Sequence, residues 1–374
     1  MQKVNIKVVV SILLLTFLID SAPALTIIDS AGNAVEIEKA ERIVCLSTDC
    51  LEAVLILGEK ERIVGLGTNA LQKPFSPNVV DVGKWSDPNI EAIVSLNPDI
   101  VITYVQWPER GKLEEKLRGT GIKVVRLDFY KINTIFDEFI TLGKILGKEE
   151  RAKEIAEYWR SQLELIKSRT EKLERVKVYW ESFSNYSAAG NGTGWNDIIL
   201  IAGGENVFGS ESGYPKVDAE KIIAKNPEVF IKSVSSSVFR PCRDDASKLI
   251  EFHASIKPRP EINQIEAGRN DRVYVIAAEL LHGTLGLIVE TAYVAKILHP
   301  SEFEDIDPKE LHERYLRSLG LKFDSLWVYP DLPDGREIFS EEESKAEKSA
   351  PGFEITLAAI AVAILLYLRA YDRL

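Results

Sequence analysis

Residues 85–102 read WSDPNIEAIVSLNPDIVI, and residues 214–231 repeat the same pattern as YPKVDAEKIIAKNPEVFI. The two stretches align without a gap, so the same residue types recur at the same spacing. In each copy an aromatic residue and a short loop precede a predicted helix, and Asn-Pro separates that helix from a β-branched strand. Repetition of a whole supersecondary unit predicts two similar lobes, because like units bury like faces.

An aromatic residue lies six positions before a glutamate in both copies. Trp85 precedes Glu91, and Tyr214 precedes Glu220. Each glutamate falls in the first turn of its helix, just after a capping Asn or Asp, where the helix dipole favours a negative charge. Dipole stabilisation alone would explain a single glutamate, and a single aromatic residue often serves only to pack a lobe. Recurrence of the pair in both copies favours a role beyond stability.

The remainder of residues 25–330 fits the same architecture. Residues 42–131 alternate predicted strands and helices, which is typical of a parallel sheet with helices on both faces, and residues 175–320 do the same. Between them, residues 149–173 form an amphipathic helix of about 37 Å. A core helix of one large domain is the alternative to a rigid spine. We predict an α/β fold of two similar Rossmann-like lobes joined by one long rigid helix, with a ligand cleft between the lobes.

Composition excludes several classes of function. The net charge of −11 argues against nucleic-acid binding and suits an exported, soluble surface. The four histidines are scattered, and the three cysteines form no C-x-x-C motif, which argues against structural zinc. Cys45 and Cys50 straddle a predicted strand-to-helix turn, where a disulfide and simple burial are equally compatible with the sequence.

Both ends of the chain carry predicted targeting segments. Residues 1–24 read as a signal peptide, with a positive start, a short apolar core and an A-x-A cleavage site, although an uncleaved anchor is the alternative. Residues 331–350 read as an acidic tether. Residues 351–374 read as a membrane anchor, because an apolar run is followed by arginines. Its PGF start resembles the C-terminal sorting signal of archaeal surface proteins, which implies removal of the tail and attachment to lipid.

Candidate ligand contacts come from loops that follow predicted strands, since ligands meet parallel sheets at the carboxyl ends of the strands. Tyr104 and Trp107 follow the strand that ends at Ile102. Arg240 lies in a polar loop after the second copy of the repeat, and His282 follows the strand 272–276. For the last two, a solvated loop position explains the residue equally well.

Several ordered motifs resemble one known family. They cover about residues 25–320 and are TIIDSAGNAVEIEKAERIVCLSTDCLEAVLILG, VGKWSDPNIEAIVSLNPDIVI, GGENVF, YPKVDAEKIIAKNPEVFI, DRVYVI and YVAKILHPSEFEDIDPKELHERYL. The chain resembles the periplasmic binding proteins that serve ABC importers of iron–siderophore complexes, haem and cobalamin. The resemblance implies two α/β lobes joined by one long helix, ligand bound between the lobes without catalysis, and little hinge motion.

The resemblance also implies residue roles. One glutamate in each lobe, here Glu91 and Glu220, docks on arginines of the membrane permease in that family. Trp85 and Tyr214 match aromatic residues that face the ligand in cobalamin binders. Cys45 and Asp49 depart from the small polar residues that are usual in the opening motif. Domain boundaries follow as N-terminal lobe 25–132, linking helical segment 133–174 and C-terminal lobe 175–330.

The sequence therefore predicts an extracytoplasmic, surface-anchored, monomeric binding protein that delivers a metal chelate or corrinoid to an ABC permease and its ATPase. It is expected to carry no cofactor of its own. The range of ligands that the family serves favours an iron complex over cobalamin. A cobalamin-specific protein is the alternative. A small-oxyanion binder, a surface-layer protein and an enzyme are further alternatives. The sequence gives little support to the enzyme alternative, because it shows no cofactor fingerprint and no nucleophile with a recognisable base.

Overall fold

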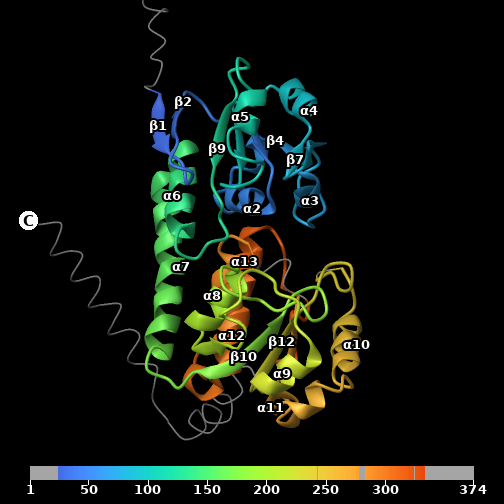
Figure 1. The fold of residues 1–374 in the computed structure, drawn as a ribbon. Helices are drawn as coiled ribbons and strands as arrows, with labels where there is room; N and C mark the ends of the chain where they lie inside the picture. The colour runs from blue at the N-terminus through green and yellow to red at the C-terminus, as the bar shows by residue number, and fades with distance from the viewer. Residues whose placement is uncertain (1–23, 242, 278–282, 324, 333–374) are drawn as a thin grey trace, which may run out of the picture.

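The computed structural model describes residues 24–241, 243–277, 283–323 and 325–332. They fold into two α/β lobes, which lie one above the other in Figure 1, and each lobe is built on a five-stranded sheet. The predicted signal peptide, acidic tether and C-terminal anchor lie almost wholly outside these ranges. Within the ranges, no helix is both long and apolar enough to cross a membrane.

The sheet of the first lobe is entirely parallel, as the alternating strands and helices predicted. Its strand order is β5-β4-β3-β8-β9. The strands are β3 (Ile43–Cys45), β4 (Ile63–Leu66), β5 (Val80–Asp81), β8 (Ile100–Thr103) and β9 (Lys123–Arg126), with helices α2 (Thr48–Ile56), α3 (Thr68–Leu71), α4 (Ile90–Ser95) and α5 (Lys112–Lys116). Two antiparallel hairpins accompany it, β1 (Leu25–Ile28) with β2 (Ala34–Ile37) and β6 (Gly83–Lys84) with β7 (Asp87–Pro88).

The sheet of the second lobe has the order β11-β10-β12-β13-β14 and is parallel except for its last strand. The strands are β10 (Val176–Glu181), β11 (Gly204–Asn206), β12 (Val229–Ser233), β13 (Val273–Ile276) and β14 (Val328–Tyr329). The helices are α8 (Gly194–Ile201), α9 (Ala219–Lys225), α10 (Ser247–Ile256), α11 (Glu266–Arg269), α12 (Gly286–Leu298) and α13 (Pro308–Ser318). Short 3₁₀ turns among the described residues cover 60–62, 262–264 and 300–303.

The repeated stretch forms equivalent helix–strand units in the two lobes, which confirms the prediction. α4 leads to β8, and α9 leads to β12. The Asn89 side chain accepts a hydrogen bond from the Ala92 N–H, and Asp218 does the same for Lys221. The Asn of Asn-Pro lies just beyond each helix and adopts a left-handed conformation, with φ of 46° in the first copy and 43° in the second. Asparagine tolerates that conformation better than most residues.

The linking segment consists of α6 (Ile135–Ile145) and α7 (Glu149–Thr170), separated by a left-handed Gly147. Figure 1 shows both helices along one side of the molecule, with α7 extending from the first lobe to the second. Its 22 residues span about 33 Å. It packs on α6 at one end and on α12 and α8 of the second lobe at the other. A folded helix rather than a flexible chain therefore connects the lobes.

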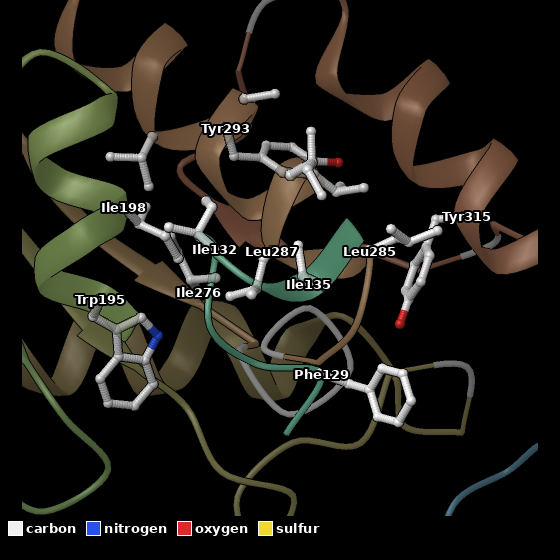
Figure 2. Close-up of a cluster of buried hydrophobic side chains, with 14 of the residues drawn as sticks. Phe129, Ile132, Ile135, Trp195, Ile198, Ile276, Leu285, Leu287, Tyr293 and Tyr315 are labelled. Atoms are coloured by element: carbon white, nitrogen blue, oxygen red, sulfur yellow. The ribbon is translucent and has the colours of Figure 1, made fainter. Parts of the chain in front are cut away.

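A single cluster of buried apolar side chains runs through both lobes and the linking helices. Figure 2 shows its central part, where side chains just after β9 and at the start of α6 pack against α8, α12, α13 and the end of β13. The labelled residues are Phe129, Ile132, Ile135, Trp195, Ile198, Ile276, Leu285, Leu287, Tyr293 and Tyr315. Burial of apolar surface is the main stabilising term in folding, so this shared core resists separation of the lobes.

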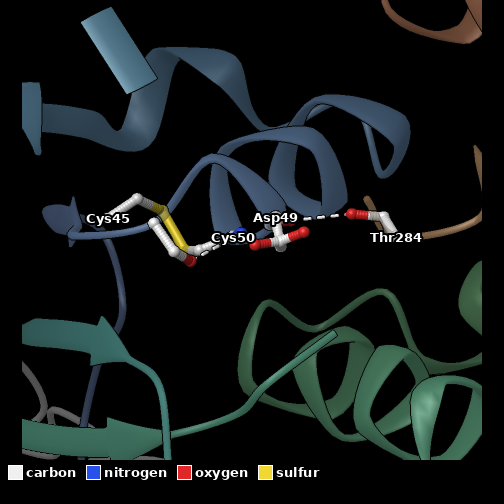
Figure 3. The surroundings of a disulfide bond; sticks show 5 residues. Cys45, Asp49, Cys50 and Thr284 are labelled. Carbon is white, nitrogen blue, oxygen red and sulfur yellow. Dashed lines mark hydrogen bonds between the residues drawn. A yellow bond between two sulfur atoms is a disulfide. The ribbon is translucent and has the colours of Figure 1, made fainter. Parts of the chain in front are cut away.

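Cys45 and Cys50 form a disulfide that joins the end of β3 to the first turn of α2 (Figure 3). Both cysteines are fully buried, and their Cα atoms lie 5.6 Å apart. The side chain of Ser47 caps α2 by accepting from the Cys50 N–H at 3.1 Å. The disulfide and the cap together fix the start of α2, which contributes Thr48 and Asp49 to the region between the lobes.

Candidate ligand-binding site

Loops beyond the carboxyl ends of strands from both sheets meet between the lobes. Asp49 lies beyond β3 and Thr284 lies beyond β13. The Thr284 hydroxyl donates to the Asp49 backbone oxygen at 3.0 Å (Figure 3). In open parallel sheets this edge carries the ligand site, because the loops there vary without disturbing the sheet. The candidate site is therefore built from the loops that follow β3, β8 and β9 in the first lobe and from those that face them in the second.

Four aromatic side chains of the first lobe form what we term the first aromatic cluster: Trp85, Tyr104, Trp107 and Tyr130. Trp85 meets the rings of Tyr104 and Trp107 edge-on, with centroids 5.7 and 5.9 Å apart. Tyr130 meets Tyr104 in the same way at 5.6 Å. Trp107 remains 52% exposed, so the cluster presents apolar ring surface to the solvent.

The hydroxyl of Tyr104 is already engaged within the protein, because it donates a hydrogen bond to the Asp49 carboxylate. Burial raises the pKa of Tyr104 well above its ordinary value, and the neighbouring Asp49 charge adds to the rise. The hydroxyl therefore stays protonated and oriented toward Asp49. The Tyr104 hydroxyl proton is therefore not available to a ligand, whereas its ring can still contact one.

Four aromatic side chains of the second lobe form the second aromatic cluster: Trp180, Phe183, Trp195 and Tyr214. Trp195 stacks on Trp180 with centroids 5.6 Å apart, and Tyr214 and Phe183 meet Trp195 edge-on at 5.9 and 5.3 Å. The two tryptophans are buried and held by hydrogen bonds from their ring nitrogens. Tyr214 and Phe183 are 51% and 45% exposed, so they form the accessible face of this cluster.

The two clusters lie within electrostatic reach of one another. Burial raises the pKa of Tyr214, and Glu290 and Tyr130 add to the rise. Tyr130 belongs to the first lobe, so Tyr214 lies near the first cluster. Aromatic surfaces on both lobes favour a flat ligand with apolar faces, since rings bury large areas and stack on planar groups.

A pocket of about 460 Å³ is lined by residues of both lobes. The first lobe contributes Thr48 at the start of α2 and Lys73 beyond α3, and the second contributes Arg240 and Arg243. Arg240 also binds Asp244 of its own loop at 2.9 Å. The sequence placed Arg240 among the ligand contacts, and the structure places it in this pocket rather than with the aromatic side chains.

Beneath the start of α2, the buried carboxyl group of Glu52 links the lobes. It accepts a hydrogen bond from the Tyr315 hydroxyl of α13 at 2.7 Å. A Cβ atom added to Gly283 would lie 2.8 Å from carboxyl oxygens of both Asp49 and Glu52, so a larger residue there would have to displace these carboxyl groups. Burial raises the pKa of Glu52 to about 8, and the Asp49 charge adds to the rise.

The raised pKa of Glu52 predicts a stability that falls between about pH 5 and pH 8. The native state holds this proton more tightly than the unfolded chain, whose glutamate has a pKa near 4.5. Stability from the protonated form is complete below that value and is lost as pH rises through 8, by an amount on the order of 4 kcal/mol. Thermal unfolding across this range should show the decline, and Glu52→Gln should flatten it. Equal slopes in both proteins would contradict the assignment.

Glu91 and Glu220 lie in the first turns of α4 and α9, as predicted, and both side chains are exposed. Equivalent positions in equivalent units place one carboxylate on the surface of each lobe. Their docking role remains a prediction.

The structure brings Trp85, Tyr104 and Trp107 together and places Tyr214 in the second aromatic cluster. His282 lies outside the described residues. In the part of the chain that is described, no group of three or more His, Cys, Asp or Glu side chains is placed to hold a metal ion.

Sequence reasoning missed Tyr130, Trp195, Lys73 and Glu52. Tyr130 follows the strand that ends at Arg126, and the same strand-end rule that selected Tyr104 would have found it. Trp195 begins the helix after the small-residue loop 188–194. Lys73 and Glu52 carry no local signal, because their neighbours in the site come from distant parts of the chain.

Comparison with known proteins defines the class. The model of the periplasmic binding protein family matches residues 43–280. The chain therefore belongs to the periplasmic binding protein family, whose members are extracytoplasmic ligand-binding transport proteins rather than enzymes. This confirms the resemblance inferred from the motifs.

One curated relative and two solved structures illustrate the similarity to known members. The chain is 26% identical over 217 residues to a cobalamin-binding protein of Halobacterium salinarum, a match that covers 56% of this chain and 58% of that protein. A TroA-like periplasmic binding protein of Veillonella parvula has a similar structure, with a TM-score of 0.67, 21% identity, and coverage of 82% of this chain and 99% of its own. The periplasmic vitamin B12 binding protein of Vibrio cholerae gives a TM-score of 0.57, 21% identity, and coverage of 70% and 97%. At these identities the solved structures show the fold alone.

Proposed function

We propose that this protein is the extracytoplasmic binding protein of an ABC importer and that it captures a flat metal complex between its two lobes. The observation that carries the proposal is the pair of aromatic clusters, Trp85 with Trp107 and Tyr130 on one side and Tyr214 on the other. A corrinoid is our first candidate, because the relative in Halobacterium salinarum is named as a cobalamin-binding protein. This reverses the preference for an iron complex that family breadth gave.

An iron complex, either haem or a ferric siderophore, remains the second candidate, because the aromatic surfaces fit any ligand with a flat apolar face. Delivery would follow docking of Glu91 and Glu220 on a permease that works with its ATPase. The C-terminal segment, which lies outside the described residues, would hold a monomer at the membrane surface.

Tryptophan fluorescence tests the proposal. The full chain is titrated with cobalamin, haem and a ferric siderophore, and saturable quenching by one of them is expected. Trp85→Ala and Tyr214→Ala should each raise the dissociation constant of that ligand by about 5- to 100-fold. Each variant removes an aromatic face that contributes roughly 1–3 kcal/mol to binding. Tyr158→Ala is a control, because Tyr158 lies on α7 and its ring meets Trp159 rather than either cluster. Unchanged affinity in both site variants would exclude the aromatic clusters as the binding surface.

A further inference from the structure

Tyr104 joins the other rings of the first aromatic cluster to the start of α2. Its ring meets Trp85 and Tyr130 edge-on, with centroids 5.7 and 5.6 Å apart. Its hydroxyl group donates to the carboxylate of Asp49, which is buried in the first turn of α2. A hydrogen bond to a charged acceptor is about twice as strong as one between neutral groups. The position of the Tyr104 ring therefore depends on where Asp49 lies.

The start of α2 is in turn held by the second lobe. The Thr284 hydroxyl, from the loop before α12, donates to the Asp49 backbone oxygen at 3.0 Å (Figure 3). One turn further along α2, Glu52 accepts a hydrogen bond from the Tyr315 hydroxyl of α13 at 2.7 Å. Both bonds connect the two lobes. Asp49 therefore links a contact between the lobes to a ring of the candidate ligand site.

The carboxyl groups of Asp49 and Glu52 lie next to each other. The two residues are three positions apart on α2 and share one face of that helix. Carboxyl oxygens of both lie 2.8 Å from a single point, the position that a Cβ atom of Gly283 would occupy. Both side chains are buried. Two negative charges placed here would repel each other more strongly than in water, because the protein interior has a lower dielectric constant.

The polar groups within reach of Glu52 belong to several elements: Asp49 of α2, Lys73 beyond α3, Tyr104 beyond β8, Thr284 before α12 and Tyr315 of α13. Burial raises the pKa of Glu52 to about 8 and the Asp49 charge adds to the rise, which the other groups oppose only in part. The two tyrosines stay protonated, because burial raises the pKa of each well above its ordinary value. Ionisation of Glu52 above pH 8 therefore places a second negative charge beside Asp49.

We propose that Asp49 is a positioning residue of the ligand site, which holds the Tyr104 ring in place for the ligand as long as Glu52 is protonated. Once Glu52 ionises, repulsion displaces the Asp49 carboxylate and the ring that is bonded to it. The inference rests on the proposed function, because the Tyr104 ring belongs to the proposed binding surface. It adds a regulation of that surface, namely that ligand affinity is complete at neutral pH and declines under alkaline conditions.

Ligand titration at pH 7 and pH 9 tests this coupling with the full chain and with whichever of cobalamin, haem and the ferric siderophore binds. The wild-type dissociation constant should rise by about three- to tenfold at pH 9, because one proton linked to binding changes affinity by at most about tenfold per pH unit. Tyr104→Phe keeps the ring but removes the bond to Asp49, so the rise should disappear. Glu52→Gln should remove it as well. Each protein receives the same compound, so ionisation of the compound itself cancels in the comparison.

A second readout separates positioning from stability. In Tyr104→Phe the thermal stability should still decline as pH rises, because Glu52 remains in place, although the ligand affinity no longer does. At pH 7, Asp49→Ala should bind about five- to tenfold more weakly than the wild type, and Asp49→Asn should recover most of that loss, since its amide oxygen can accept the Tyr104 hydroxyl. Asp137→Ala is the matched control, because Asp137 is an exposed residue in the first turn of α6.

The possible outcomes distinguish this inference from the proposed function. If wild-type affinity is the same at pH 7 and pH 9, or if the rise persists in Tyr104→Phe, the positioning role of Asp49 is wrong and the proposed function stands. If none of the three compounds binds the wild-type protein, the proposed function fails and the inference fails with it. Circular dichroism spectra establish that each variant is folded.

Discussion

Replacing Glu91 and Glu220 together with alanine is expected to reduce ligand uptake to background and to leave ligand affinity unchanged. Both side chains are exposed in the first turns of equivalent helices. Truncating one partner of a charge pair that becomes buried on docking costs about 2–5 kcal/mol. The double variant should therefore bind the permease about a thousandfold more weakly or worse.

The measurement pairs uptake in cells or vesicles that contain the permease with ligand titration of the isolated variant. Glu115→Ala/Glu150→Ala is the matched control, since both residues are exposed glutamates in the first turn of a helix, α5 or α7. The control should transport normally. Loss of ligand affinity in Glu91→Ala/Glu220→Ala would show that these residues serve the site and not the permease.

Replacing Glu181 with alanine is expected to lower the free energy of unfolding by roughly 3–5 kcal/mol, because it removes the carboxylate that pairs with the buried Lys232 ammonium and leaves Arg259 with Glu261 alone. Glu181 is fully buried at the end of β10. Its carboxylate accepts two hydrogen bonds from Arg259, at 2.9 and 3.0 Å, and lies 3.2 Å from the Lys232 ammonium. Burial alone would raise the pKa of Glu181, yet Arg259 and Lys232 hold it below its ordinary value.

Denaturant unfolding measures this loss, with Glu174→Ala as the control because Glu174 is exposed just before the same strand. A loss below about 1 kcal/mol, the size typical of surface pairs, would contradict the assignment. The same network holds the loop that carries Phe183, since Lys232 donates to the backbone oxygens of Ser182 and Phe183. Ligand affinity should therefore weaken along with stability.

The two-lobe architecture was predictable because interactions between residues close in sequence determine its units. The capping side chains of Asn89 and Asp218, the Asn-Pro boundaries and the β-branched strands act within a few residues, so their pattern specifies each unit wherever it lies in the chain. The glutamates of the repeat were predictable for the same reason.

Contacts between distant residues limited prediction of the site. The bond between Tyr315 and Glu52 joins positions 263 residues apart, and nothing near either residue indicates the other. Likewise, the pocket lined by both lobes gathers Lys73 and Arg240 from distant parts of the chain. The Cys45–Cys50 disulfide depends on how a strand end meets a helix start, so the spacing alone left it open.

The apolar core that runs through both lobes affects how efficiently the ligand would be imported. A protein whose halves share one interior keeps the same outline whether the space between them is empty or filled. Under the proposed function, a permease that recognises the outer surface would receive unloaded copies as readily as loaded ones. Unloaded copies would then act as competitors, so that producing more of the protein than there is cargo would slow import.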